Sequence, residues 1–184
     1  MELTHLRQAI GVVDRDFAQA IARRLEHPLN AQLYTAASAP RTPSALAEAL
    51  VNVPDARTKS LAIAGFYRNV VIQNLCDEGC DAAARECIEF DNLCLEALAR
   101  RFNYSSLVGQ TKLKAGLVPA ETIEASITNT AVEEAVYSRL DTFAREVGIG
   151  EPKRRHLIGV YRDWIVPASR ILQVLQLQQR QRLR

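Results

Sequence analysis

Polar side chains interrupt the apolar faces of several expected helices, and their types suit an anionic ligand. Arg7 lies between Leu3 and Ile10 at helical spacing, so it borders the apolar stripe of the first helix. Arg101 continues the apolar face of a later helix, and Lys112 lies eleven residues beyond it. Cations that are buried without matching acids require an anionic partner. These three positions therefore indicate a site for a negatively charged molecule.

Two further polar pairs occur at a spacing that places both members on one helix face. Asn129 and Glu133 are four residues apart, and so are Ser169 and Gln173. If all these faces converge, the interior holds two arginines, one lysine, one glutamate and several neutral hydrogen-bonding groups. The excess of positive charge favours a small dicarboxylate, because the guanidinium fork matches a carboxylate.

Each of these residues also has a purely structural interpretation. Arg7 and Arg101 could extend to solvent or pair with acids on neighbouring helices. The spacing Thr130-x-x-Glu133 fits a capping box at a helix start. The last polar pair could mark a solvated strip.

Other chemistries have little support in the sequence. The three histidines, His5, His27 and His156, are far apart, and no nucleophile–base constellation is evident. Four cysteines cluster without a C-x-x-C pair or a nearby histidine, so we expect buried small side chains: Cys76, Cys80, Cys87 and Cys94. We expect no metal and no cofactor.

Composition places the chain among ordinary globular proteins. Of its 184 residues, 48% are hydrophobic and 24% charged, with a formal net charge of +2. This balance argues against a broad basic face for nucleic acid. No stretch approaches the length of a membrane-spanning helix, and the N-terminus lacks a signal pattern, so we expect no membrane partner and a cytoplasmic location.

Apolar residues recur at steps of three and four along most of the chain. The pattern predicts helices over about 3–25, 43–51, 56–75, 81–101, 105–114, 132–147 and from 154 to near the C-terminus. Pro167 should kink the last helix. No convincing internal repeat and no strand-like alternation are evident. The sequence thus predicts an all-α, single-domain antiparallel helical bundle over residues 1–184.

The sequence resembles the all-helical chorismate mutases, in their eukaryotic-type branch. Four blocks carry the resemblance: Leu6 to Arg24 with Asn30 to Tyr34 after it, Asp91 to Phe102 with Lys112 beyond it, Ile127 to Glu134, and Val160 to Gln173. The resemblance implies the [3,3] rearrangement of chorismate to prephenate, in the shikimate pathway of aromatic amino-acid biosynthesis. That reaction uses one substrate and requires no nucleophile, metal or cofactor.

The resemblance also implies roles for the polar residues. Arg7 and Arg101 would grip the two carboxylates of chorismate. Lys112 and Gln173 would donate to the ether oxygen of the breaking bond, and Glu133 would accept from the ring hydroxyl. Two neutral side chains would complete the contacts: Asn129 and Ser169.

The chain departs from the family pattern in three places. Gln173 replaces a glutamate, so its amide should donate without first binding a proton. Arg170 and Ile171 lie where the family tends to be acidic. The stretch between Tyr34 and Asp91 is shortened, where other members form an effector site and a dimer contact. We therefore expect no regulation by tyrosine or tryptophan, while a homodimer stays open because related enzymes are often dimeric.

Two alternatives remain from the sequence. An isochorismate pyruvate-lyase or a 4-amino-4-deoxychorismate mutase would need the same carboxylate grips. A non-catalytic helical interaction protein could keep the bundle, but all seven polar positions here hold chemically competent side chains.

Overall fold

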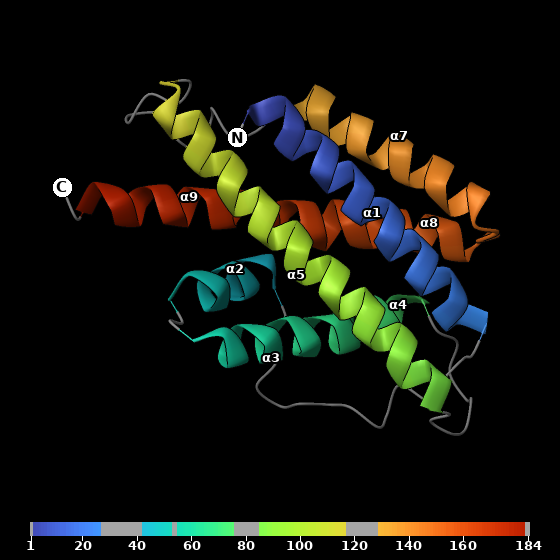
Figure 1. Ribbon diagram of the computed structural model, residues 1–184. Helices are drawn as coiled ribbons and strands as arrows, with labels where there is room; N and C mark the ends of the chain where they lie inside the picture. Colours follow the sequence, from blue (N-terminus) through green and yellow to red (C-terminus); the bar gives the residue numbers. More distant parts are fainter. Residues whose placement is uncertain (1, 27–41, 53–54, 76–84, 117–128, 183–184) are drawn as a thin grey trace.

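The computed structural model describes residues 2–26, 42–52, 55–75, 85–116 and 129–182, and within these ranges it contains helices and no strand (Figure 1). The all-α prediction is therefore confirmed. The elements in chain order are α1 (Leu3–Glu26), α2 (Pro43–Asn52), α3 (Ala56–Phe66), the π-helical η2 (Tyr67–Ile72), α4 (Gln73–Leu75), α5 (Arg85–Lys114), α7 (Thr130–Glu146), α8 (Lys153–Val160), the π-helical η4 (Tyr161–Ile165) and α9 (Val166–Arg182).

Side-chain caps and a glycine fix several helix ends. Thr42 Oγ1 accepts from the Ala45 backbone N–H at 3.1 Å, so α2 begins where the sequence predicts. Gly148 has a φ of 81° after α7, a conformation that glycine adopts without strain. The alternative that Thr130 and Glu133 form a capping box is wrong. Asn129 caps α7 instead, because its side-chain oxygen accepts from the Val132 backbone N–H at 3.1 Å.

The expected break between residues 101 and 105 is also wrong, because α5 is one helix of 30 residues. Asn103 and Ser105 lie at the expected break, and both residue types are poor helix formers in isolation. Here Ser105 and Ser106 are buried, and the Ser106 hydroxyl donates to Gln176 Oε1 of α9 at 2.6 Å. Tertiary contacts therefore override the local preference.

At Pro167, where the sequence predicts a kink, the structure has a π-helical segment just before the proline. η4 ends two residues before the proline, and α9 continues the helix from Val166. Proline lacks the N–H that an α-helix needs, so a wider turn before it accommodates the lost hydrogen bond.

Helices α1 and α5 pack against each other in antiparallel order. Cross-helix ion pairs join Asp14 to Arg101, Asp16 to Arg100 and Arg24 to Asp91, so residue numbers rise on α1 as they fall on α5. In Figure 1 this pair crosses the helix formed by α8, η4 and α9, while α7 lies beside α1.

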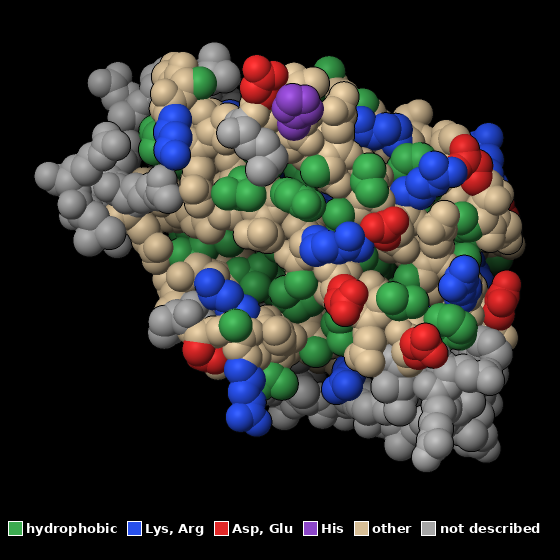
Figure 2. All heavy atoms as spheres, in the orientation of Figure 1, with side chains coloured by type: hydrophobic (Ala, Val, Ile, Leu, Met, Phe, Trp, Pro, Cys, Tyr) green, Lys and Arg blue, Asp and Glu red, His purple; other side chains and the backbone are tan. Residues whose placement is uncertain are grey.

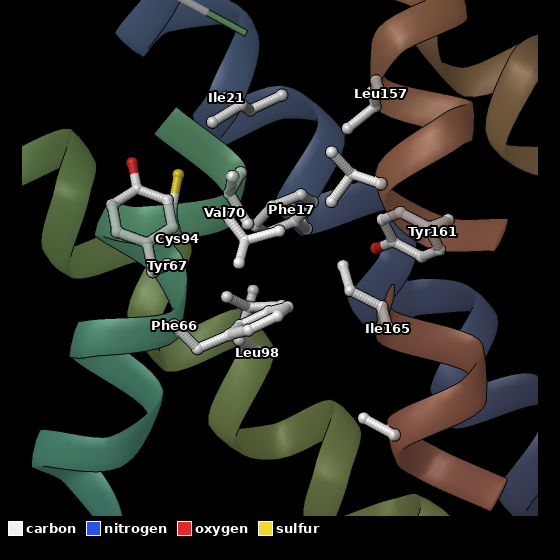
Figure 3. Packing of buried hydrophobic residues seen from close by; sticks show 14 of the residues in the cluster. Phe17, Ile21, Phe66, Tyr67, Val70, Cys94, Leu98, Leu157, Tyr161 and Ile165 are labelled. Atoms are coloured by element: carbon white, nitrogen blue, oxygen red, sulfur yellow. The ribbon is translucent and has the colours of Figure 1, made fainter. Parts of the chain in front are cut away.

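The hydrophobic core lies where α1 and α5 meet two helices that contain a π-helical segment (Figure 3). One of these is formed by α3, η2 and α4, and the other by α8, η4 and α9. The ring centroids of Phe17 and Tyr161 are 5.9 Å apart, and those of Phe66 and Trp164 are 6.3 Å apart. Cys94 is fully buried in this core, as expected. The prediction for the other cysteines cannot be compared, since Cys76, Cys80 and the side chain of Cys87 lie outside the described residues.

The structure reveals an internal repeat that the sequence analysis missed. Each π-helical segment begins with a buried tyrosine, Tyr67 or Tyr161, and follows the pattern Gly-x-Tyr-Arg. Tyr67 donates to Asp91 at 2.6 Å, and Tyr161 donates to Asp14 at 3.1 Å. Each aspartate also accepts from a buried arginine of the partner helix. The repeat is carried by so few residues that the sequence alone did not expose it.

Helices α5 and α9 approach each other closely at a glycine. A Cβ atom added to Gly109 would lie 3.0 Å from Cγ and 3.1 Å from Cβ of Gln173. The absence of a side chain at residue 109 therefore sets how closely Gln173 packs against α5.

We predict that Asp91→Ala lowers the free energy of unfolding by about 2–3 kcal/mol. The change removes the acceptor shared by the buried Arg24 and Tyr67. Asp16→Ala is the matched control, because its pair with Arg100 joins the same two helices but is half exposed, and it should cost less than about 1 kcal/mol. Urea denaturation of both variants measures the difference; equal losses would contradict the prediction.

We predict opposite effects for two glycine-to-alanine changes. Gly11→Ala should stabilise the protein by about 0.5–1 kcal/mol, because alanine favours helix and no atom lies within 4 Å of the new Cβ. Gly109→Ala should lose that gain or destabilise the protein, since Gln173 must move. Thermal unfolding compares the two, and a stabilised Gly109→Ala variant would show that α9 adjusts freely.

Candidate functional site

A cavity of about 390 Å³ lies between α1, α5, α7 and α9. This volume suits a small organic ligand. The seven residues that the sequence analysis singled out all line it: Arg7, Arg101, Lys112, Asn129, Glu133, Ser169 and Gln173. Their catalytic and binding roles stay a prediction, but their convergence on one cavity is a feature of the structure.

Arg101 is the most firmly held of the cavity residues. Its side chain is 4% exposed, its Nε donates to Asp14 Oδ1 at 2.7 Å, and its Nη1 donates to Ser169 Oγ at 2.6 Å. Its guanidinium carbon also lies 5.3 Å from the centre of the Tyr161 ring. Arg101 is thus paired with an acid, which is one of the structural alternatives raised by the sequence, and it still borders the cavity.

Burial and charge act in opposite directions on this cluster. Burial is the largest single effect and lowers the pKa of Arg101, but the charge of Asp14, the neighbouring Tyr161 and the hydrogen bond to Asp14 together outweigh burial and raise the pKa. Burial, followed by the charge of Asp14, raises the pKa of Tyr161 well above its usual value. Tyr161 therefore remains a hydrogen-bond donor to Asp14, and the guanidinium keeps its charge.

Arg7 and Lys112 form a second, unneutralised positive region. Neither has a hydrogen bond or ion pair with the residues that the structure describes. Burial and the neighbouring charge of Arg7 lower the pKa of Lys112. The positive charge on Lys112 is therefore unfavourable in the protein alone, and an anionic ligand would relieve this effect.

Glu133 forms an ion pair with Arg170 across the cavity wall. Arg170 is the arginine that the sequence analysis found at a position where the family tends to be acidic, and the pair gives it a structural role. Arg170 Nη1 of α9 donates to Glu133 Oε1 of α7 at 3.3 Å. The pair leaves both side chains on the cavity lining. Because Asn129 is the cap, Glu133 has no capping-box role.

The three neutral residues differ in their availability to a ligand. The side-chain oxygen of Gln173 is buried and has no hydrogen-bond partner among the described residues. Ser169 donates to the Ile165 carbonyl at 2.8 Å while it accepts from Arg101. Asn129 uses its side-chain oxygen to cap α7, which leaves its amide N–H groups for other contacts.

Sequence reasoning missed four residues that shape the site. Arg139 and Arg170 line the cavity, while Asp14 and Tyr161 lie behind Arg101 and hold it. A signal existed for Asp14, which interrupts an apolar stripe seven residues after Arg7, on the same helix face. Nothing in the sequence pairs Asp14 with Arg101, since 87 residues separate them.

The cavity is strongly positive although the molecule is not. Five cationic side chains and one acidic side chain line it: Arg7, Arg101, Lys112, Arg139 and Arg170 against Glu133. On the face shown in Figure 2, blue and red side chains are interspersed, without a patch of one sign. The positive charge that matters is therefore local to the cavity, which suits a small polyanion better than a nucleic acid.

Within the described ranges, no helix has the length and apolar character needed to cross a bilayer. The same ranges contain no group of three or more histidine, cysteine, aspartate or glutamate side chains placed to hold a metal ion.

Sequence relatives agree with the resemblance. Residues 84–174 match the family described as chorismate mutase type II. A chorismate mutase of Trichoderma parareesei is 31% identical over 49% of this chain and 41% of its own length. Chorismate mutase 1, chloroplastic, of Petunia hybrida is 26% identical over 70% of this chain and 47% of its own length. The chain thus spans less than half the length of these curated relatives.

Solved structures share the fold across nearly the whole chain. The chloroplast chorismate mutase from Zea mays matches with a TM-score of 0.72 and 17% identity, over 98% of this chain and 96% of the other. AtCM1 with tyrosine bound in its allosteric site matches with a TM-score of 0.71 and 18% identity, over 98% of this chain and 97% of the other. Residues 84–174 thus match the chorismate mutase type II family in sequence, and the described residues share an all-helical fold with solved chorismate mutases.

Proposed function

We propose that this protein is a chorismate mutase, an isomerase that converts chorismate to prephenate. The observation that carries the proposal is the convergence of seven family-type polar residues on one positively charged cavity between four helices. The match of residues 84–174 to the chorismate mutase type II family supports the same activity. The reaction breaks the ether C–O bond and forms a C–C bond within one molecule, so it requires positioning and charge stabilisation.

The cationic residues provide the positioning. Arg101, fixed by Asp14 and Ser169, offers a rigid guanidinium to one substrate carboxylate. Arg7, on α1, would bind the second carboxylate. Holding both carboxylates brings the side chain of chorismate over its ring and restricts the flexible ether linkage.

Lys112 and Gln173 provide the charge stabilisation. Negative charge develops on the ether oxygen as the C–O bond lengthens, and these two groups would donate to it. No described residue forms a hydrogen bond with the side chain of Gln173, so its amide N–H groups, which would donate, are not committed to the protein. Glu133 would accept from the ring hydroxyl, with Asn129 and Ser169 as further contacts.

Several properties of the protein remain proposals or predictions. A pathway role in aromatic amino-acid synthesis follows from the activity, while the cytoplasmic location, the single-domain organisation and a homodimer stay predictions. AtCM1 has a solved structure with tyrosine in an allosteric site. For this chain, the absence of regulation by tyrosine or tryptophan stays a prediction from its shortened stretch.

The central experiment offers chorismate to the purified protein and measures prephenate. We predict that Lys112→Ala lowers kcat by about 100-fold or more, the usual effect of removing one such donor, with an almost unchanged melting temperature. Lys114→Ala, an exposed lysine on the same helix, is the control and should retain activity. Undiminished prephenate formation by Lys112→Ala would contradict the assigned role, and an inactive wild type would favour the interaction-protein reading.

The amide at residue 173 predicts an unusual pH dependence. The wild-type rate should vary little between mildly acidic and neutral pH, because an amide donates in both conditions. Gln173→Glu should lose activity as pH rises, since the carboxyl group donates only while it holds its proton. Steady-state rates from about pH 4 to 8 compare the two, since the ordinary pKa of a glutamate carboxyl group is about 4.3. Superimposable profiles would remove Gln173 from the ether-oxygen contact.

A further inference from the structure

The Arg170–Glu133 pair is the only direct ion pair between two lining residues of the cavity among those that the structure describes. Arg170 Nη1 lies 3.3 Å from Glu133 Oε1, and the two side chains are 32% and 22% exposed. Arg101, by contrast, pairs with Asp14, which lies outside the lining. The charge of Glu133 is thus opposed within the cavity itself.

This pairing changes what Glu133 offers to a ligand. A lone carboxylate accepts from a neutral hydroxyl, and it attracts an ammonium more strongly through its full charge. A carboxylate that already faces a guanidinium still accepts a hydrogen bond from a hydroxyl, but its attraction for a second cation is much weaker. Lys112 and Arg7 add further positive charge to the same cavity.

We propose that Arg170 is a specificity-determining residue, which makes the site select a dicarboxylate with a neutral ring hydroxyl over one with a ring ammonium. The proposal rests on the proposed function, because it assumes that Glu133 faces the ring substituent. It separates chorismate from 4-amino-4-deoxychorismate, whose aliphatic amine is largely protonated at neutral pH. The two substrates otherwise need the same carboxylate grips.

Arg170→Met tests the proposal, because it removes the charge and keeps an apolar stem of similar length. The experiment measures kcat/KM for chorismate and for 4-amino-4-deoxychorismate with each variant at neutral pH. We expect the ratio of the two values to shift toward the amino substrate by about tenfold or more. Arg170→Lys should keep a ratio near that of the wild type, because it restores a cation at the same position.

Arg162→Met is the matched control. Arg162 is exposed on η4, lies over the Tyr137 ring at 5.3 Å and does not line the cavity, so its loss removes the same charge without touching Glu133. Its ratio should equal that of the wild type. An equal shift in Arg162→Met would show a general effect of net charge and would overturn the proposal.

The outcomes separate this inference from the function on which it rests. An unchanged ratio in Arg170→Met, with chorismate still converted, overturns the specificity role and leaves the chorismate mutase proposal intact. A wild type that converts neither substrate overturns the function first. If Arg170→Met does not fold, Arg170→Gln provides a second neutral side chain, and the same ratio decides.

Discussion

The buried pair of Arg101 and Asp14 is the interaction on which the site depends. A guanidinium in a helical core is strongly unfavourable unless an acid and further acceptors surround it. Here Asp14 from α1, Ser169 from α9 and the ring of Tyr161 from η4 surround Arg101 of α5. Their contacts fix the guanidinium at the edge of the cavity, so the part of it that faces the cavity is oriented before any ligand arrives. Such preorganisation is what electrostatic catalysis requires.

A cluster of an arginine, an aspartate and a tyrosine occurs twice, and each copy joins α1, α5 and a π-helical segment. The cluster therefore has a structural role in holding these helices together. Arg24, Asp91 and Tyr67, near the C-terminal end of α1, repeat the arrangement that Arg101, Asp14 and Tyr161 form near the middle of the α1–α5 pair. Both tyrosines begin a π-helical segment. One cluster borders the cavity described above, and the other is built into the core. Arg101 therefore uses a structural motif that the fold already needs, and its acid, Asp14, lies outside the cavity lining.

The sequence predicted most of the helices from their apolar periodicity, whereas the gathering of the polar residues in one site followed from the resemblance to the chorismate mutases. Arg7, Glu133 and Gln173 each line the cavity from a different helix, although Arg7 is an exposed side chain. Interactions between distant segments were not predictable, since periodicity contains no information on which helices meet. Asp14 and Arg170 belong to this class, as both act by pairing with a residue from another helix. The continuity of α5 was missed for the same reason, because Ser106 is held in the helix by a contact to α9.

The positions of the acidic side chains explain how a cavity lined by several cations can be stable in the folded protein and still bind an anion. Asp14 compensates Arg101 from behind, and Glu133 compensates Arg170 from the side. Arg7 and Lys112 have no such compensation among the described residues, and burial together with the neighbouring charge of Arg7 lowers the pKa of Lys112. A dianionic ligand would supply the missing charge to these two residues, while the compensated arginine would hold its geometry. The division allows strong binding without an unpaired guanidinium in the core, which the folded state would not tolerate.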